Sequence, residues 1–394
     1  MDLDVYQPYL RNIEKDKDQF LYQTMEWSKI HSYSLDSIGL NLMATHLDHA
    51  FGTLNATREA FLLPHGKLLK FTKKKRCKHK ILLLGHYDTV YPPENPISDP
   101  EIQSSKILKG AGVADMKGGI VVMLAALRAF ESSPYSEEMG WTVLLNPDEE
   151  IGSPFSTPYL QEFASDHHLG LIFEPAFPDG SLVSARKGSM NVSVTFRGRA
   201  AHSGRDFSHG RSAIFALCDA IYHMENIELT EDETLNVGKV EGGTGANIVP
   251  EQASCLLNIR SSTHSRMEEL WQCIEKICKR VSLREGISFD IAKKTSRMPK
   301  PFDKKTENHF VYLRECGKSL GLEINWRQSG GVCDGNTLAE AGLPTIDSLG
   351  VVGGYLHSPE EYLLIPSIIE RAKLTALFLM RYAKERRGEI ENIT

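Results

Sequence analysis

The sequence lacks the features that mark secreted, membrane-spanning and nucleic-acid-binding proteins. Its first twenty residues contain neither the basic segment nor the apolar segment of a signal peptide. No window holds 18 uninterrupted apolar residues, so we expect no membrane-spanning helix and no membrane partner. The formal net charge is −6, which leaves no strong positive field to attract nucleic acid or anionic lipid.

Cysteine is scarce and scattered. The seven cysteines form no CxxC pair, and their number is odd. Without a signal peptide, this pattern is typical of reduced thiols, so we expect a cytoplasmic protein. Of the 394 residues, 41% are hydrophobic and 24% are charged, which is typical of a globular protein with two domains or slightly more.

Apolar patterns predict two kinds of domain. Strands and helices alternate from residue 80 to residue 177, which favours a mostly parallel α/β sheet. After residue 187 the period changes to two, as in antiparallel strands with one face in water, and helices follow. We therefore expect an α/β domain formed by residues 1–187 and 298–394, with an α+β domain inserted at 188–297.

Acidic and imidazole side chains lie where the predicted strands end. In "KILLLGHYDTVYPP", an apolar strand at 81–84 is followed directly by His86 and Asp88. The other side chains of this kind, at strand ends or in loops, are Asp115, Glu149, Glu150, Glu174 and His357. Because the carboxyl ends of parallel strands line one edge of the sheet, where ligands bind, we expect these groups to converge.

Such a cluster favours a divalent metal, because closely packed carboxylates cannot all stay ionised without compensation. Two imidazoles and three carboxylates offer mixed nitrogen and oxygen ligands, a set that favours zinc over magnesium. Five ligands are too many for one catalytic zinc, so we expect two zincs that share a bridging carboxylate. Asp88 follows His86 by two residues in an extended segment and can hold the far nitrogen of that imidazole.

Each of these residues alone has an ordinary structural explanation. A histidine after a strand is usually a surface histidine or a hydrogen-bonded one, and "DEE" at 148–150 would be a solvated acidic loop. Asp115 would be a helix N-cap, and His357 a loop residue ahead of a capped helix. Only their joint occurrence, in one order and at strand ends, favours the metal site.

Three other motifs fail on their context. In "GAGVAD", Asp115 occupies the third glycine position of a dinucleotide-binding loop and would repel a pyrophosphate. The G-x-S-x-G match at 317–321 ends an amphipathic helix instead of joining a strand to a helix. The basic run at 70–80 lacks interleaved aromatics and leads into a buried strand, so we interpret it as a solvated hairpin.

Six segments resemble, in the same order, the signature blocks of the co-catalytic di-zinc amidohydrolases and exopeptidases. They are "GHYDTV", "GAGVADMKGGI", "NPDEEIGS", "IFEPA", "RAAHSG" and "GGYLHSPEEY", and they span about residues 75–365. The family includes acetylornithine deacetylase, succinyl-diaminopimelate desuccinylase, aminoacylase and glutamate carboxypeptidase. The segments "GGVCDGN" and "LGVVGGYLHSPEEY" look most like glutamate carboxypeptidase and its relatives.

The resemblance implies a role for each candidate. One zinc would be held by His86, Asp115 and Glu174, and the other by Asp115, Glu150 and His357, with cobalt or manganese as substitutes. Glu149 would be the general base, and Asp88 would orient His86. The resemblance also implies a cis peptide bond after Asp115. It implies a ferredoxin-like inserted domain that serves as a lid and forms a homodimer.

The inserted domain would supply part of the substrate side of the site. The family equivalent of His202 crosses from the partner subunit and stabilises an oxyanion, whereas the sequence alone favours an ordinary hairpin histidine. Asn247 and Arg260 match family positions near the substrate, although Arg260 could equally form a salt bridge on a strand face. Gly330 and Gly331, in "SGGVCDGN", would let backbone amides approach the substrate carboxylate.

These features predict zinc-dependent hydrolysis of an amide bond, in a small N-acyl amino acid or at the C-terminal peptide bond of a peptide. A metallopeptidase resembling glutamate carboxypeptidase is the function we expect. The alternatives are an N-acyl-amino-acid deacylase such as acetylornithine deacetylase, and a metal-binding relative without catalysis. Glu149, retained beside an intact set of ligands, argues against the last.

Overall fold

The computed structural model describes residues 3–74, 76–94 and 99–391, and its contacts divide the chain into two compact units. The first unit comprises Met1–Ser184, Phe302–Gln328 and Cys333–Thr394, and the second comprises Ala185–Pro301 with Ser329–Val332. The boundaries expected from the sequence fall at 187 and 297, with residues 329–332 in the larger domain, whereas the contacts group these four residues with the inserted unit. None of the helices in the described part of the chain combines the length and apolar composition that a membrane crossing needs.

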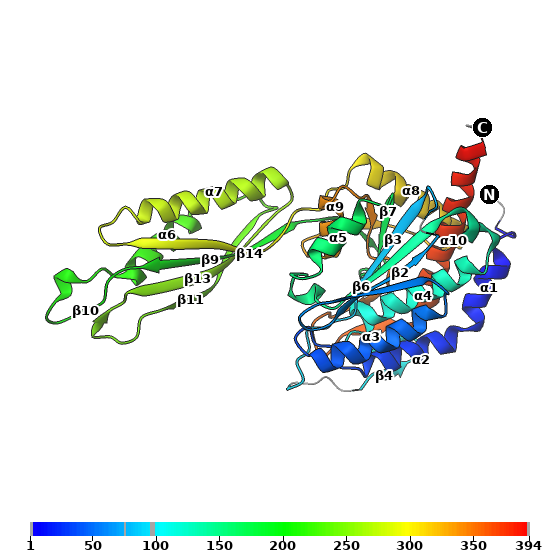
Figure 1. Cartoon of the computed structure of the whole chain (residues 1–394), viewed down its shortest axis with the longest axis horizontal. Coiled ribbons are helices and arrows are strands. Elements are labelled where there is room, and N and C mark those ends of the chain that lie inside the picture. The colour runs from blue at the N-terminus through cyan, green and yellow to red at the C-terminus, as the bar shows by residue number, and fades with distance from the viewer. Residues whose placement is uncertain (1–2, 75, 95–98, 392–394) are drawn as a thin grey trace. The chain divides into compact units, whose positions relative to one another are not determined.

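A sheet of six described strands forms the centre of the first unit, in the order β1-β2-β6-β3-β7-β16 (Figure 1). The strands are β1 (Thr57–Leu62), β2 (Lys67–Lys73), β3 (Lys80–His86), β6 (Gly140–Asn146), β7 (Leu169–Ile172) and β16 (Thr345–Ile346). Strands β6, β3, β7 and β16 pair in parallel, and β1 and β2 add an antiparallel edge. The mainly parallel sheet confirms the predicted fold class.

The basic run at 70–80 is not a hairpin, because the strands on its two sides are not neighbours. Strand β2 pairs with one edge of β6, and β3 pairs with the other. The first residues of the run, Lys70, Phe71 and Thr72, are buried in β2. The prediction was wrong because a run of lysines indicates solvated side chains and carries no information about which strands pair.

Helices cover both faces of the central sheet. They are α1 (Gln7–Lys15), α2 (Lys17–Ser28), α3 (Ser37–Gly52), α4 (Gly118–Glu131), α5 (Thr157–Ala164), α8 (Lys304–Ser319), α9 (Asp334–Glu340) and α10 (Ile365–Glu391). In β3, Ile81 and Leu83 join the core that contains α4 and α10, whereas Leu82 and Leu84 join the core that contains α5 and α9. Burial on both faces explains why this strand is a continuous apolar run and does not alternate.

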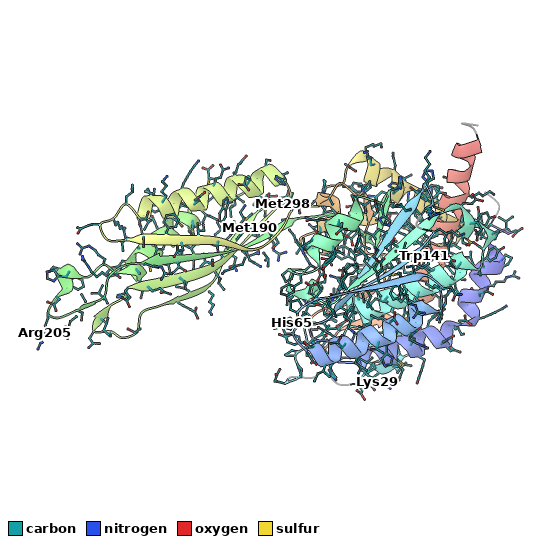
Figure 2. The ribbon with its side chains drawn as sticks, in the orientation of Figure 1. Lys29, His65, Trp141, Met190, Arg205 and Met298 are labelled. Atoms are coloured by element: carbon teal, nitrogen blue, oxygen red, sulfur yellow. The ribbon has the colours of Figure 1, made fainter. Side chains whose placement is uncertain are left out.

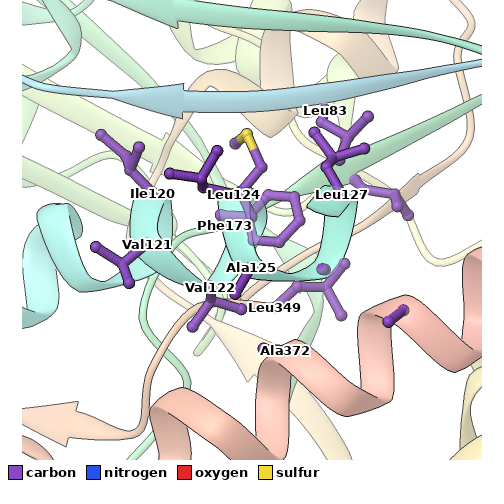
Figure 3. Close-up of a cluster of buried hydrophobic side chains, with 14 of the residues drawn as sticks. Leu83, Ile120, Val121, Val122, Leu124, Ala125, Leu127, Phe173, Leu349 and Ala372 are labelled. Carbon is purple, nitrogen blue, oxygen red and sulfur yellow. The ribbon is translucent and has the colours of Figure 1, made fainter. Parts of the chain in front are cut away.

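Helix α4 lies at the centre of the larger core (Figure 3). Its side chains from Ile120 to Leu127 are buried, and Leu124 belongs to the same cluster as Leu83 and Phe173. A Cβ atom added at Gly119 would lie 2.1 Å from the carbonyl oxygen of Phe173. The glycine therefore lets the first turn of α4 lie against the end of β7, next to one of the candidate carboxylates.

The second unit is a four-stranded antiparallel sheet with two helices, in the strand order β11-β13-β9-β14. Its elements are β9 (Gly188–Arg197), β11 (Thr234–Gly242), β13 (Gln252–Ser261), β14 (Ser288–Arg297), α6 (Ala213–Glu225) and α7 (His264–Val281). In β9, Met190, Val192 and Val194 are buried in the core of this unit, while Arg205 lies in an exposed loop (Figure 2). Strands β13 and β9 are interior, so β11 and β14 are the edges of this sheet.

Short strands fasten several loops. Strands β17 (Gly353–Gly354), β18 (Tyr362–Leu364), β5 (Ile107–Lys109) and β4 (Glu101–Ser104) form a small sheet in that order. Strand β10 (Ala201–His202) pairs with β12 (Ile248–Val249), and β8 (Leu182–Arg186) pairs with β15 (Trp326–Ser329). Pairing of β5 with β18 joins the segment before α4 to the segment before α10.

The G-x-S-x-G match lies at the end of a helix. Helix α8 ends at Ser319, and Gly321 follows with a φ of +73°, in the left-handed region that favours glycine. The motif is therefore a helix terminus and not a strand-to-helix turn.

Substitution of Leu124 by alanine should lower the free energy of unfolding by about 2–5 kcal/mol, because it leaves a cavity in a tightly packed core. Ile38 on α3 is 83% exposed, so Ile38→Ala is a matched control that should stay within about 0.5 kcal/mol of the parent. Urea-induced unfolding followed by circular dichroism measures both. Similar values for the two variants would contradict the central place of α4 in the core.

Candidate metal centre

His86 is the last residue of β3, and Asp88 follows it in the loop. Both side chains are buried, and Oδ1 of Asp88 lies 3.2 Å from Nδ1 of His86. Because β3 is packed on both faces, the imidazole has a rigid support. Its other nitrogen, Nε2, faces the carboxylates of the centre.

Asp115 lies between two imidazoles. Its Oδ1 is 3.1 Å from Nε2 of His86, and its Oδ2 is 3.3 Å from Nε2 of His357. A further carboxylate lies beside each ring. Oε1 of Glu174 is 3.7 Å from Nε2 of His86, and Oε2 of Glu150 is 3.1 Å from Nε2 of His357. The five side chains therefore form two groups that share Asp115.

Glu149 belongs to the same centre and is buried. One of its oxygens lies within 4.8 Å of potential ligand atoms of His86 and Glu174, which also lie within that distance of each other. His86, Asp115 and Glu150 form a second set with the same spacing. Proximity alone therefore does not distinguish Glu149 from the five expected ligands. All seven residues that the sequence analysis singles out in the first unit come together here.

The carboxylates and imidazoles shift one another's pKa values. Burial raises the pKa of Glu150 to about 8, and the charge of Asp115 adds to the rise. Burial opposes a charge on His86, but hydrogen bonds to Asp115 and Asp88 raise its pKa well above the ordinary value. Hydrogen bonds to Asp115 and Glu150 raise the pKa of His357 to about 11. Both shifts have the same cause, which is the negative charge of the carboxylates beside each ring.

This set of donor atoms fits divalent cations. Several buried carboxylates that lie close together need a compensating positive charge, which a bound cation would supply. Mixed nitrogen and oxygen ligands suit zinc. Two groups that share one carboxylate match the arrangement of a two-metal site.

Asp88 also holds the loop that carries two of the carboxylates. Its Oδ1 accepts a hydrogen bond from the amide of Glu149 at 3.1 Å. Its Oδ2 accepts one from the amide of Glu150 at 3.1 Å and one from the hydroxyl of Ser34 at 2.7 Å. One fully buried carboxylate therefore connects an imidazole to the backbone of the acidic loop.

Asp334 holds the two ends of the same loop. Its Oδ2 accepts a hydrogen bond from Nδ2 of Asn146 at 2.7 Å, and its Oδ1 accepts one from the hydroxyl of Ser153 at 2.5 Å. Asn146 ends β6, and Ser153 lies just beyond the acidic residues. The acidic segment is thus fastened on both sides.

Glu361 holds the loop that carries Asp115. Its buried carboxylate accepts hydrogen bonds from the amides of Gly112, Ala114 and Asp115, at 2.9–3.0 Å, and from the hydroxyl of Tyr91 at 2.7 Å. Burial raises the pKa of Glu361, and the hydrogen bond from Tyr91 opposes that rise. The peptide bond after Asp115 is cis, as the resemblance implies.

Lys117 is a buried lysine close to the carboxylates of Glu361 and Asp88. Its ammonium group donates a hydrogen bond to the carbonyl oxygen of Ile30 at 2.6 Å. Burial lowers its pKa to about 7, while the charges of Glu361 and Asp88 act in the opposite direction.

Sequence reasoning missed five residues that support the centre: Ser34, Tyr91, Lys117, Asp334 and Glu361. The last three lie inside segments quoted for the family resemblance, so charged residues within those blocks were the available signal. The sequence contained no signal for Ser34 or Tyr91. Ser34 contacts a residue 54 positions away, and Tyr91 contacts one 270 positions away.

His202 and Asn247 lie together in the second unit. Strands β10 and β12 pair, with His202 opposite the residue that follows Asn247. The carbonyl oxygen of Asn247 accepts a hydrogen bond from the amide of Ser203 at 3.0 Å. Both His202 and Asn247 are exposed.

Arg260 and the two glycines form another group in the second unit. Arg260 donates from Nη1 to the carbonyl oxygen of Gly330 at 2.7 Å and from Nε to Oδ1 of Asn258 at 3.1 Å. The carbonyl oxygen of Gly331 accepts a hydrogen bond from Arg186 at 3.4 Å. The guanidinium of Arg260 is therefore attached to the glycine segment.

Comparison with known proteins identifies relatives along most of the chain. A model of "Peptidase family M20/M25/M40" matches residues 82–381. Carboxypeptidase G2 of Pseudomonas sp. (strain RS-16) is 28% identical over 349 residues, which cover 86% of this chain and 82% of that protein. Succinyl-diaminopimelate desuccinylase of Nitrosospira multiformis is 25% identical over 319 residues, which cover 75% of this chain and 82% of that protein.

Solved structures have the same fold. A tripeptidase of Staphylococcus aureus superposes with a TM-score of 0.77 at 21% identity, over 93% of this chain and 99% of that one. An M20 family metallo-carboxypeptidase of Sulfolobus solfataricus gives a TM-score of 0.73 at 18% identity, over 92% and 99%. The family resemblance drawn from six short segments is confirmed: the chain belongs to peptidase family M20/M25/M40 and is a hydrolase of the metallopeptidase type.

Proposed function

We propose that the protein is a zinc-dependent hydrolase resembling glutamate carboxypeptidase, which cleaves the amide bond of a small N-acyl amino acid or the C-terminal peptide bond of a peptide. The observation that carries the proposal is Asp115, whose two oxygens face two imidazoles, each with a further carboxylate beside it. Similarity to carboxypeptidase G2 over 86% of the chain supports the substrate class. An N-acyl-amino-acid deacylase, such as acetylornithine deacetylase, is the second candidate, supported by similarity to a desuccinylase.

In this proposal two zinc ions would share Asp115. His86 and Glu174 would complete one site, and Glu150 and His357 would complete the other, with cobalt or manganese as substitutes. When bound, the zinc pair would polarise the substrate carbonyl and lower the pKa of a water molecule to about 7.

The protein's own residues move the proton and orient the groups. Glu149 takes a proton from the attacking water and delivers it to the leaving amine, a role that contributes roughly 10²–10⁴-fold to the rate. Asp88 keeps the imidazole of His86 in one orientation. His202 stabilises the oxyanion of the tetrahedral intermediate.

The substrate carboxylate is the remaining charge to be recognised. We propose that Arg260 binds this carboxylate, together with the backbone amides of Gly330 and Gly331. Asn247 would contact the substrate nearby. Attachment of the Arg260 guanidinium to the glycine segment supports this assignment, because the contact limits the rotamers of a long side chain before substrate arrives. Gly330 supports it too, since the position of its missing Cβ is open space.

We include a homodimer in the proposal. Strand β11 lies at an edge of its sheet, and α6, which packs near that edge, carries Phe215 and Tyr222 with 68% and 62% of their surface exposed. Aromatic side chains beside a sheet edge are typical of protein interfaces. A second copy on this face would cover both. We also propose a cytoplasmic location, where the seven cysteines would stay reduced.

The function is tested with zinc-loaded protein and a panel of N-acyl-glutamates, N-acyl-ornithines and peptides that end in glutamate. We expect hydrolysis of the glutamate compounds and its loss by at least 10²-fold in Glu149→Ala, with zinc content and fold unchanged. Glu162 is an exposed glutamate on α5, so Glu162→Ala is the matched control. Preference for N-acyl-ornithines would favour the deacylase, and activity of Glu149→Ala within about tenfold of the parent would remove Glu149 as the base.

The bridge is tested by zinc content. Asp115→Ala should lose both activity and zinc, because each proposed site contains that carboxylate. Inductively coupled plasma mass spectrometry after dialysis should find about two zinc ions in the parent and in Asp166→Ala, an exposed control, and fewer in Asp115→Ala. Two full equivalents in Asp115→Ala would exclude a bridging role.

Assembly is tested by complementation between inactive variants. If His202 acts on the partner's site, mixed dimers of His202→Ala and Glu149→Ala subunits contain one intact site. Activity should then return to about half of the parent value per mixed dimer if the sites are independent. Phe215→Glu should abolish both dimer and rescue, while Leu283→Glu, 81% exposed elsewhere, should keep them. A monomeric parent protein in analytical ultracentrifugation, or proven subunit exchange without rescue, would refute action in trans.

A further inference from the structure

Glu361 lies outside the proposed set of ligands, yet it holds the backbone next to the shared carboxylate. Its Oε1 accepts hydrogen bonds from the amides of Ala114 and Asp115, at 2.9 and 3.0 Å. Its Oε2 accepts one from the amide of Gly112 at 3.0 Å and one from the hydroxyl of Tyr91 at 2.7 Å. Four donors converge on two oxygens, an arrangement that fits an ionised carboxylate acting only as an acceptor.

The same residue is fastened to the segment that carries His357. The amide of Glu361 donates to the carbonyl oxygen of Ser358 at 3.1 Å, and the hydroxyl of Tyr91 also contacts that oxygen at 3.2 Å. In the other direction, the carbonyl oxygen of Glu361 accepts a hydrogen bond from the amide of Gly110 at 3.1 Å. Glu361 therefore joins the loop that ends at Asp115 to the loop that begins at His357.

The two halves of the centre depend on this junction to different degrees. His86 ends β3, and Glu174 follows β7, a neighbouring strand, so their backbones are held by the sheet. Asp115 and His357 both come from loops, and the His357 backbone has a positive φ of 59°. The contact of 3.3 Å between these two side chains therefore needs a connection other than the sheet.

We propose that Glu361 is a positioning residue for the metal pair: it sets the distance between Asp115 and His357, and the site completed by Glu150 and His357 depends on it more than the site completed by His86 and Glu174. The inference rests on the proposed two-zinc function. Substituting Glu361 would leave buried amides without an acceptor and would loosen the Asp115 loop relative to the His357 loop, while the pairing of β5 with β18 would still hold the flanking segments together.

Glu361→Gln is the sharpest substitution, since it keeps the size of the side chain. Its NH₂ group would occupy one of the two oxygen positions and face backbone N–H groups, donor against donor. Glu360 is the matched control: it is the neighbouring glutamate, its side chain is 67% exposed, and it pairs with Lys109 at 2.7 Å on the surface. Glu360→Gln should therefore leave zinc binding unchanged.

The experiment titrates zinc into metal-free, full-length protein in competition with a chromophoric chelator, after circular dichroism has shown that each variant is folded. The parent and Glu360→Gln should bind two zinc ions. Glu361→Gln should keep one site close to the parent affinity and bind the second about 10–100-fold more weakly. His357→Ala removes a ligand of the other site, so the zinc affinity that this variant retains is the affinity of the site completed by His86 and Glu174. A purely structural role would lower the melting temperature of the metal-free protein without separating the two affinities.

Tyr91→Phe is the second variant if Glu361→Gln fails to fold. It keeps every amide contact of Glu361 and removes only the hydroxyl that also touches Ser358, so it should weaken the same site by a smaller factor. Equal weakening of both sites, or of neither, would overturn the inference while leaving the two-zinc function intact. A parent protein with fewer than two zinc sites would overturn both.

Discussion

Ionised carboxylates that are buried close together repel one another, and the first unit must hold several of them in place despite that repulsion. Asp115, Glu150 and Glu174 come from three separate segments, and their burial side by side makes it costly to keep all three ionised. They stay within reach of two imidazoles because the backbone of each segment is held in place. A parallel sheet packed on both faces fixes the first points of attachment, and hydrogen bonds to the loops fix the rest.

Carboxylates have two different uses in this centre. Asp88 and Glu361 accept hydrogen bonds from backbone amides, so their charges are balanced by peptide dipoles and they serve as fasteners. The oxygens of Asp115 face imidazole nitrogens, positions at which a metal can replace a proton. Backbone partners therefore distinguish Asp88 and Glu361, which hold the site, from Asp115, which is available to bind.

The difference between what could be predicted and what could not follows from the range of the interactions. His86 and Asp88 were predictable because a continuous apolar strand and the residue after its end are local features of the sequence. The fold class was predictable for the same reason, since alternation of strands and helices is local. Ser34 and Tyr91 were not, because their hydrogen bonds join segments that only the folded chain brings together.

The same limit explains the wrong hairpin. Strand β6 comes more than sixty residues after β2 in the chain, yet it lies between β2 and β3 in the sheet. No pattern within the basic run at 70–80 could reveal that insertion. Glu361 is an intermediate case, because its block was identified but no local pattern separates it from its exposed neighbour Glu360.

The two-sided burial of β3 has a consequence for folding fidelity. A slip of one residue would exchange Ile81 and Leu83 with Leu82 and Leu84, and all four are apolar, so the two cores would tolerate the error better than an alternating strand would. The same slip would turn His86 to the opposite face, away from Asp115. Hydrophobic packing alone therefore specifies the register of β3 only weakly. The position of His86 beside Asp115 distinguishes the native register from one that has slipped by one residue.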